Sequence, residues 1–517
     1  MIKKILIANR GEIALRVIRT CKEIGVKTVA LCPLPGQEKN FLETQLADEY
    51  YFLGKEGVEG YLDKRLLIEI AKKARVDAIH PGYGFLAENW EFAKLCKRHK
   101  IIFIGPSPLI LKNLENKLRA KKIARKVRIP VLPDSQGPIR SKKDLVKWAR
   151  KIAPPFVLKA LRGGGGVGIK VINGEISLGE LFFLCGSLQR QTRTAFADTD
   201  LYLEKSLPRV KHIEFQILGD GKKFLHLGER ECTIQRRFQK LLEEAPSMSI
   251  EQGLREKMAY LALKMAKELR YEGVATIEFL VDEKKNFYFI EVNPRIQVEH
   301  PITEVITGID LVEQQIKIAQ KERIKFSQDD IYFSGWAIEA RINAEDPLKN
   351  FKPCPGKVER YFPPGGQGVF VHTFLHDGQE IFPYFDPLLV KLIGFGKDRK
   401  EAISRLRRAL DEIIITGIKT NIPLFKALLT EERFLRGYFY TDFIEKGKIL
   451  EKINLAEICE KIHFPKEGIE EKEIAKMVFE IYQALREGTK GDLQKENVFS
   501  NNWLMAERLK MLNDYEI

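Results

Sequence analysis

Residues 275–300 read Ala-Thr-Ile-Glu-Phe-Leu-Val-Asp-Glu-Lys-Lys-Asn-Phe-Tyr-Phe-Ile-Glu-Val-Asn-Pro-Arg-Ile-Gln-Val-Glu-His and contain two strand-like runs around a polar turn. Side chains alternate between the two faces of a strand, so Glu291 and Asn293 share one face. The polar residues 282–286 are typical of a hairpin turn. If Asp282 pairs with Phe287, Glu278 lies directly opposite Glu291. The stretch therefore predicts a hairpin that carries two carboxylates and a carboxamide on one face.

Carboxylates placed directly opposite each other destabilise a sheet unless a cation compensates them. Oxygen ligands of this kind suit Mg²⁺ or Mn²⁺, so Glu278, Glu291 and Asn293 form a candidate metal site. The alternative, for the hairpin alone, is a solvated face on which the glutamates are tolerated. Five polar side chains within residues 293–300 favour the functional interpretation.

The chain has 517 residues, which is too long for one hydrophobic core and predicts two to four domains. No apolar run approaches the length of a membrane span, and residues 1–8 have the pattern of a strand instead of a signal peptide. The seven cysteines are scattered and form no CxxC pair, which disfavours a zinc site and a disulfide framework. We therefore expect a cytoplasmic protein with no membrane partner.

The net charge of +15 is compatible with nucleic acid or an acidic membrane surface, and also with anionic substrates and an acidic partner. The basic residues are dispersed, and no Lys/Arg run is interleaved with aromatic residues. This favours anionic substrates and predicts no nucleic-acid partner.

Short apolar strands alternate with amphipathic helices over the first hundred residues. The expected strands are 4–8, 28–32, 49–53, 77–80 and 101–104, and the expected helices are 12–24, 64–74 and 90–100. This alternation predicts a parallel, doubly wound sheet. The first turn, Asn9–Glu12, has one glycine and is no dinucleotide fingerprint. The turn from His80 to Phe85 follows a strand, where open α/β sheets bind ligands.

A linking helix is expected at 106–128 and carries Lys117, and a smaller unit follows up to residue 203. Its strand 156–159 ends at Lys159 and runs into four consecutive glycines, Gly163–Gly166. Such a loop suits backbone contact with phosphates and a movable lid, although a plain linker is the alternative. No Gly-Lys-Ser/Thr follows, so it is no Walker A loop.

The remaining chain alternates longer strands and helices. We expect strands at 169–172, 210–218, 224–227 and 338–346, and helices at 252–269 and 303–319. Residues 448–517 differ in character: an apolar stripe from Ile474 to Leu485 and a stretch at 503–512 predict two helices.

Several motifs now share an order that resembles biotin carboxylase over about residues 1–447. They are Ile7–Ala14, His80–Leu86, the glycine loop after Lys159, Glu243–Pro246, Arg295–Pro301 and Arg341–Glu345. The segment Asn-Pro-Arg-Ile-Gln-Val-Glu-His is the specific one. The resemblance implies an ATP-grasp ligase that activates bicarbonate as carboxyphosphate and carboxylates biotin held on a carrier protein.

The resemblance also assigns roles to residues. ATP would contact Lys117, Lys159, Gly165, Gly166, Glu204, Lys205, Leu207, His212, Glu278 and Glu291, while Glu278, Glu291 and Asn293 would hold Mg²⁺ or Mn²⁺. Bicarbonate would lie among Lys240, Arg295, Gln297 and Val298, with Glu299 as its base. Arg341 would stabilise the biotin enolate, with Tyr83 and Arg16 nearby. An ordinary salt bridge is the alternative for each charged residue. The physical chemistry agrees, because phosphoryl transfer and enolate formation both need fixed cations.

Three positions depart from the family pattern. Phe238 replaces a histidine and removes a polar contact to ATP, and Arg162 and Val167 replace a glycine and an arginine in the loop. None of them belongs to the metal or bicarbonate set, so we expect activity.

The implied fold is α/β and α+β. It comprises a doubly wound N-terminal domain (1–115), an ATP-grasp lid with the linking helix (116–203), an ATP-grasp core with a barrel-like C-terminal domain (204–447) and a helical extension (448–517). The extension would serve as a docking element or as a helical cap.

The resemblance implies a homodimer, with Arg19 and Glu23 at its interface. The chain has no biotin-attachment segment, so the expected partners are a biotin carboxyl carrier protein and a carboxyltransferase subunit. The acyl acceptor, whether acetyl-CoA, propionyl-CoA, pyruvate or 2-oxoglutarate, belongs to that other subunit. The rival functions are another ATP-grasp ligase, such as a carboxylase of purine synthesis or a carbamoyl phosphate synthase, and an ATP-binding regulatory protein with a decayed site.

Overall fold

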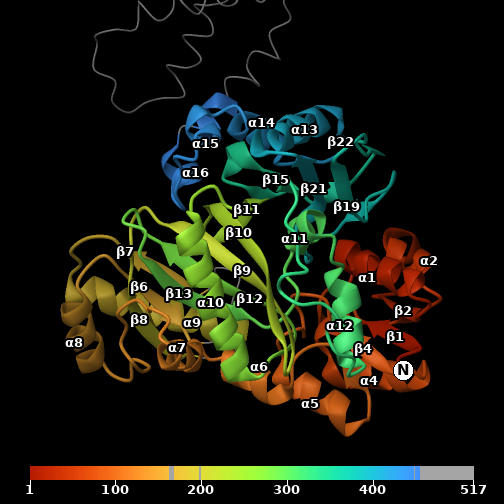
Figure 1. Cartoon of the computed structure of the whole chain (residues 1–517), viewed down its shortest axis with the longest axis horizontal. Coiled ribbons are helices and arrows are strands. Elements are labelled where there is room, and N and C mark those ends of the chain that lie inside the picture. Colours follow the sequence, from red (N-terminus) through yellow and green to blue (C-terminus); the bar gives the residue numbers. More distant parts are fainter. Residues whose placement is uncertain (162–167, 197–198, 448, 454–517) are drawn as a thin grey trace, which may run out of the picture. The chain divides into compact units, whose positions relative to one another are not determined.

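The computed structural model describes residues 1–453 except 162–167, 197–198 and 448 (Figure 1). Gly165, Gly166, Arg162 and Val167 of the glycine loop lie outside the described residues, as do the helices expected beyond residue 453. The chain divides into two units, Met1–Ile453 and Asn454–Ile517, and only the first is described below. No helix among the described residues is long and apolar enough to cross a membrane.

The N-terminal region is a parallel five-stranded sheet in the order β3-β2-β1-β4-β5. Ile5 and Ile7 of β1 pack with helix α1, whereas Leu6 on the other face packs against α4 and α5. Helices thus cover both faces, which confirms the doubly wound prediction. The bounds are β1 Lys4–Ile7, α1 Gly11–Glu23, β2 Lys27–Cys32, α2 Leu42–Leu46, β3 Glu49–Phe52, α3 Glu59–Leu62, α4 Lys64–Lys73, β4 Ala78–His80, α5 Trp90–Arg98 and β5 Ile102–Phe103.

Two helices predicted as single are each divided. The linking helix is α6 (Pro108–Leu114) followed by α7 (Lys117–Lys126), because the Asn116 side chain caps a new helix by accepting from two backbone N–H groups. The helix predicted at 303–319 is α11 (His300–Thr307) and α12 (Leu311–Ala319). Gly308 adopts a positive φ of 70° between them, and Asp310 caps α12.

A small antiparallel sheet in the order β7-β6-β8 lies in the region predicted to form the lid, and we call it the lid sheet. It has its own core, in which Phe156 and Leu158 of β6 pack with Leu145 of α8 and Leu181 of α9. The bounds are α8 Lys142–Ile152, β6 Phe156–Ala160, β7 Ile169–Ile172, α9 Leu178–Phe196 and β8 Leu201–Lys205.

The largest sheet has eight antiparallel strands in the order β13-β12-β9-β10-β11-β14-β21-β19 (Figure 1). Alternate residues of β9, such as Ile213 and Phe215, pack with Met258 and Met265 of helix α10 (Gln252–Leu269). The residues between them are polar and point to the opposite face. The strands are β9 Lys211–Asp220, β10 Phe224–Arg236, β11 Gln239–Ala245, β12 Glu272–Val281, β13 Phe287–Asn293, β14 Trp336–Asn343, β19 Val369–Thr373 and β21 Leu388–Gly396.

The predicted pairing of Glu278 with Glu291 is confirmed, but a bulge creates it. The register at the turn pairs Val281 with Phe287 and shifts by one residue between Phe279 and Glu278. Without the bulge, Phe289 and Glu291 would share one face. The extra residue, Ile290, lets Phe289 enter the core while Glu291 faces the polar side.

The expected barrel-like C-terminal domain is not observed: among the described residues, no sheet closes into a barrel. Strands β14, β21 and β19 extend the central sheet instead, because each pairs edge to edge with its neighbour, and α13 packs over them. The remaining elements are β15 Glu345–Asp346, β16 Lys352–Pro353, β17 Gly356–Lys357, β18 Arg360–Phe362, β20 Glu380–Ile381, α13 Arg399–Glu412, β22 Ile414–Thr416, α14 Ile422–Leu428, α15 Glu432–Leu435 and α16 Phe443–Lys446.

Candidate functional site

Charged side chains form a row across the polar face of the central sheet. Glu291, Glu278, Glu214 and Arg230 are successive register partners on β13, β12, β9 and β10. Directly opposite residues of a sheet lie side by side on the same face. Three neighbouring carboxylates need cations to neutralise them. Strands β10 and β11 supply Arg230 and Lys240.

Lys240 on β11 is the central cation. Its Nζ lies 2.5 Å from Glu214, 2.9 Å from Glu278 and 2.7 Å from Glu299. Burial disfavours the charged ammonium, but the three carboxylates overcome this and raise the pKa of Lys240 well above its usual range. The lysine is therefore cationic at neutral pH and connects the metal and bicarbonate candidates.

Arg230 neutralises the row from its β10 end. It is fully buried, and its Nε donates to Glu214 at 2.6 Å while its other nitrogens donate to Gln216, Thr276 and Thr303. Such complete satisfaction is what a buried guanidinium requires.

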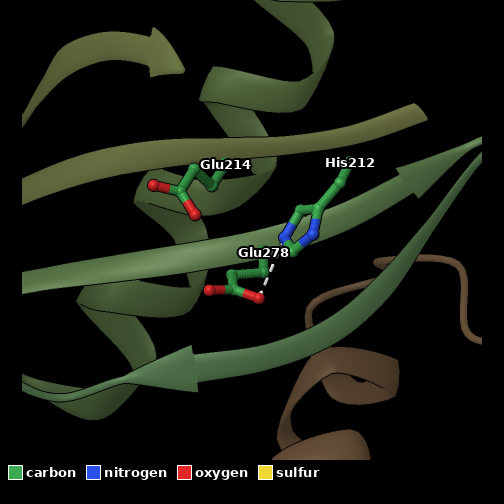
Figure 2. Close-up of side chains that lie close together, drawn as sticks. All are labelled: His212, Glu214 and Glu278. Atoms are coloured by element: carbon green, nitrogen blue, oxygen red, sulfur yellow. Dashed lines mark ion pairs between the residues drawn. The ribbon is translucent and has the colours of Figure 1, made fainter. Parts of the chain in front are cut away.

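The predicted metal ligands lie in one cluster. Glu278 accepts a hydrogen bond from Asn293 at 2.8 Å and pairs with His212 at 3.0 Å. Figure 2 shows His212, Glu214 and Glu278 converging, and one ligand atom from each lies within 4.8 Å of the others. Against the effect of burial, Lys240 and His212 lower the pKa of Glu278.

Glu291 has free coordination capacity. Its side chain is 31% exposed, and its ion pair with Lys117 is long, at 3.9 Å. Burial raises the pKa of Glu291, opposed by Lys117 and reinforced by Glu278. A divalent cation between the two glutamates would relieve this repulsion, and their oxygen donors fit Mg²⁺ or Mn²⁺.

The segment after β13 presents the bicarbonate candidates. Arg295 pairs with Glu88 at 2.6 Å, and its guanidinium reaches Gln297 at 3.3 Å. Gln297 also donates to Glu278 at 3.3 Å. The half-buried Val298 and the fully buried Glu299 follow. Arg295, Gln297 and Glu299 are thus drawn together with the metal candidates.

Glu299 lies between two cations. Besides Lys240, it accepts from Arg341 on β14 at 2.8 Å. Although burial opposes ionisation, Lys240 and Arg341 lower the pKa of Glu299 well below its usual range. Arg341 also pairs with Glu243, whose pKa burial raises to about 7.

The two remaining biotin candidates differ. Tyr83 donates to Glu12, and burial raises the pKa of Tyr83 well above its usual value. Arg16 instead pairs with Glu304 at 2.8 Å and Asp310 at 3.0 Å, so its guanidinium is committed to α11 and the start of α12.

The nucleotide candidates gather where α7 meets the lid sheet. Glu204 on β8 pairs with both Lys159 on β6 and the buried Lys121 on α7. Against burial, these two lysines lower the pKa of Glu204 to about 2. The Lys205 side chain donates to the carbonyls of residues 153 and 154, and Leu207 is half-buried.

Sequence reasoning assigned no role to several residues that complete the site. They are Glu12, Glu88, Lys121, Glu214, Glu243 and Lys391. Strand alternation could have identified Glu214, which shares the parity of His212. The others depend on contacts between distant segments.

Phe238, which departs from the family pattern, lies at the β10–β11 turn, where the residue is 49% exposed.

Comparison with known proteins decides the family. The family model "Biotin carboxylase, N-terminal domain" matches residues 1–111 and "Biotin carboxylase C-terminal domain" matches residues 339–446. Between them, "Carbamoyl-phosphate synthase L chain, ATP binding domain" matches residues 116–326. Biotin carboxylase 1 of Bacillus subtilis is 46% identical over 453 residues, which is 87% of this chain and 100% of that protein. The chain belongs to the biotin carboxylase family.

Relatives that are named for different carboxylases are similar to this chain to nearly the same degree. The 2-oxoglutarate carboxylase small subunit of Hydrogenobacter thermophilus is 45% identical over 86% of this chain and 94% of its own length. The crystal structure of the biotin carboxylase domain dimer of that carboxylase, in complex with MgADP, ADP and bicarbonate, superimposes with a TM-score of 0.84. It is 44% identical and covers 87% of this chain and 99% of that chain.

Proposed function

We propose that this protein is a biotin carboxylase that uses ATP and bicarbonate to carboxylate biotin on a carrier protein. The observation that carries the proposal is the placement of Glu299. It touches Lys240, which reaches the metal candidate Glu278, and Arg341, the proposed biotin residue. A single carboxylate thus joins the phosphoryl-transfer side to the biotin side.

On the nucleotide side, Lys117 and Lys159 would contact the phosphates, with Gly165 and Gly166 as the lid. Glu204, Lys205 and Leu207 would hold the adenine, and His212 the ribose end. Glu278, Glu291 and Asn293 would hold Mg²⁺ or Mn²⁺, which would neutralise charge on the phosphates.

Bicarbonate would bind among Lys240, Arg295, Gln297 and Val298. Glu299 would take its proton, and the resulting carbonate oxygen would attack the γ-phosphorus as ADP leaves, giving carboxyphosphate. The pKa of Glu299 is low because Lys240 and Arg341 surround it. A bicarbonate anion bound to Lys240 would weaken the attraction between Lys240 and Glu299. The pKa of Glu299 would then rise, and bicarbonate itself would make Glu299 a stronger base.

The same proton transfer would prepare Arg341. While Glu299 is ionised, Arg341 is neutralised by Glu299 and Glu243 together. Once Glu299 is protonated, one counter-charge is lost, and the guanidinium exerts a stronger field on a neighbouring oxyanion. Carboxyphosphate would then break down to carbon dioxide and phosphate, and the phosphate would take the N–H proton of biotin. Arg341 would stabilise the resulting biotin enolate as it attacks the carbon dioxide, with Tyr83 beside it.

The proposed assembly is a homodimer that works with a biotin carboxyl carrier protein and a carboxyltransferase subunit. Support comes from the biotin carboxylase dimer of the 2-oxoglutarate carboxylase relative. The domain division 1–115, 116–203, 204–447 and 448–517 is retained as part of the proposal. Another ATP-grasp ligase is less favoured, because both flanking family models are those of biotin carboxylase.

The test is ATP hydrolysis by the purified chain with bicarbonate and free biotin. We expect hydrolysis that requires bicarbonate and increases with biotin. Hydrolysis that ignores biotin and responds to a different acceptor would reject the proposal in favour of another ligase. ATP binding without turnover would indicate a regulatory protein.

A further inference from the structure

Lys391 is a fully buried lysine for which the proposed reaction has no role. It lies on β21, directly opposite Arg341 of β14 and His372 of β19. Its Nζ pairs with Glu12 at 2.9 Å and donates to the Val298 carbonyl at 2.8 Å. Taking an ammonium group out of water costs several kcal/mol unless its partners compensate. Both partners are therefore essential to this arrangement.

The contact with Val298 fixes part of the proposed bicarbonate segment. The Val298 carbonyl belongs to the peptide group that leads into Glu299. The preceding carbonyl, of Gln297, accepts from His300 Nδ1 at 2.7 Å. Burial lowers the pKa of His300 well below its usual range, so the ring is neutral and carries its proton on Nδ1. Two successive peptide groups are thus each held by a buried side chain.

Glu12 fixes the lysine in turn. It lies in the first turn of α1 and is itself buried. Tyr83 donates a hydrogen bond to one Glu12 oxygen, and Lys391 forms an ion pair with the other. The N-terminal region therefore reaches the bicarbonate segment through Glu12 and Lys391, and reaches the biotin side through Tyr83.

We propose that Lys391, held by Glu12, is a positioning residue that orients the Val298–Glu299 peptide for bicarbonate capture. This role rests on the proposed function. The lysine contacts no reacting group in the proposed scheme; it acts through the Val298 carbonyl and sets the direction of the Glu299 side chain that follows.

The test is a double variant, Lys391→Met with Glu12→Gln. Removing the cation and the anion together leaves no unpaired buried charge, and both replacements nearly preserve volume. Displacing a reacting group by about 1 Å can cost roughly 100-fold in rate, so we expect kcat/KM for bicarbonate to fall roughly 10- to 100-fold. The KM for MgATP should stay unchanged, because Lys391 contacts no proposed nucleotide residue.

A matched control is Lys211→Met with Glu231→Gln. Lys211 is also buried on the central sheet, pairs with Glu231 at 3.0 Å and donates to the Gly437 carbonyl at 3.0 Å. It differs in touching no part of the bicarbonate segment. We expect this variant to lower the Tm and leave kcat/KM for bicarbonate at the wild-type value.

Three results would overturn the positioning role. One is an unchanged bicarbonate kcat/KM in the folded Lys391/Glu12 variant; another is an equal loss in the control. If the double variant does not fold, the single variant Glu12→Gln should show a smaller decrease in kcat/KM for bicarbonate, with the KM for MgATP unchanged. The third contradicting result is that Glu12→Gln shows no such decrease. These three results contradict only the positioning role, because in each of them the wild-type protein still hydrolyses ATP when bicarbonate is present. A wild-type protein without bicarbonate-dependent ATP hydrolysis would overturn the proposed function as well.

Discussion

Glu299 and Glu291 are both buried or half-buried glutamates of the same segment, but their partners differ. Glu299 contacts the cations Lys240 and Arg341, whereas Glu291 faces Lys117 and the carboxylate of Glu278. The first environment suits a proton acceptor held in place, and the second suits a metal ligand. The same side-chain type thus suits two different proposed roles, because its neighbours differ.

Glu299→Gln should abolish bicarbonate-dependent ATP hydrolysis while MgATP binding persists. The amide keeps the size of the side chain but cannot accept the bicarbonate proton, and loss of general-base catalysis costs roughly 10²- to 10⁴-fold. Glu291→Gln should instead weaken MgATP binding, at least as much as the roughly 10- to 100-fold carried by outer-shell ligand partners. Calorimetric titration with MgATP and initial rates distinguish them. Identical behaviour of the two variants would contradict this division of roles.

At the scale of elements, the junction of α7 with the lid sheet depends on one carboxylate. Glu204 of β8 receives Lys121 from α7 and Lys159 from β6, and Asp134 accepts from Lys121 at 3.1 Å. The pKa of Glu204 is lowered to about 2 in the folded chain, against 4.5 for the ordinary side chain. Ionised Glu204 therefore stabilises the fold above pH 4.5, and this contribution is lost as pH falls from 4.5 to 2.

Glu204→Gln should accordingly be less stable than the wild type at neutral pH, by on the order of 3 kcal/mol. The difference should shrink as pH falls from 4.5 toward 2, because the wild-type carboxylate then becomes protonated. Differential scanning calorimetry across this range measures it. Glu69→Gln, on the exposed face of α4, is the control and should change little. A difference that stays constant down to pH 2 would exclude Glu204 as its source.

Local pattern predicted most elements but not how they end or bend. The strands of residues 4–104 were predicted within about one residue, because alternating apolar runs and helix periodicity are local. The Ile290 bulge was missed, since it depends on fitting Phe289 into a core built by α10. The divided helices were missed because the caps Asn116 and Asp310 look like ordinary polar residues in the sequence.

For the whole molecule, the resemblance to biotin carboxylase proposed more site residues than the local pattern did. Lys391, Glu12 and Glu88 were missed because each has a partner far away in the chain. The barrel expectation failed for a related reason. Whether strands close or extend a sheet depends on edge pairing between distant segments, which no local period encodes.

Truncation tests the extent of the first unit. Ile449 and Ile453 are buried in the same core as the C-terminal strands, and Lys452 pairs with Glu431. A chain that ends after Ile453 should keep the full-length Tm and bicarbonate-dependent hydrolysis. One that ends after Gly447 loses both isoleucines, each worth about 1.5–3 kcal/mol, and should melt earlier. Thermal unfolding compares the two; equal Tm values would show that these isoleucines do not stabilise the unit.

The charged row has a geometric consequence for the whole enzyme. Glu278 and Arg341 belong to strands separated by four steps of one hydrogen-bonded sheet. Each step is about 4.8 Å, a pitch that backbone hydrogen bonds hold nearly constant. The distance between the proposed metal residue Glu278 and the proposed biotin residue Arg341 is therefore set by a fixed number of strand spacings. The strands β7, β6 and β8 form a separate sheet, so this spacing does not apply to them.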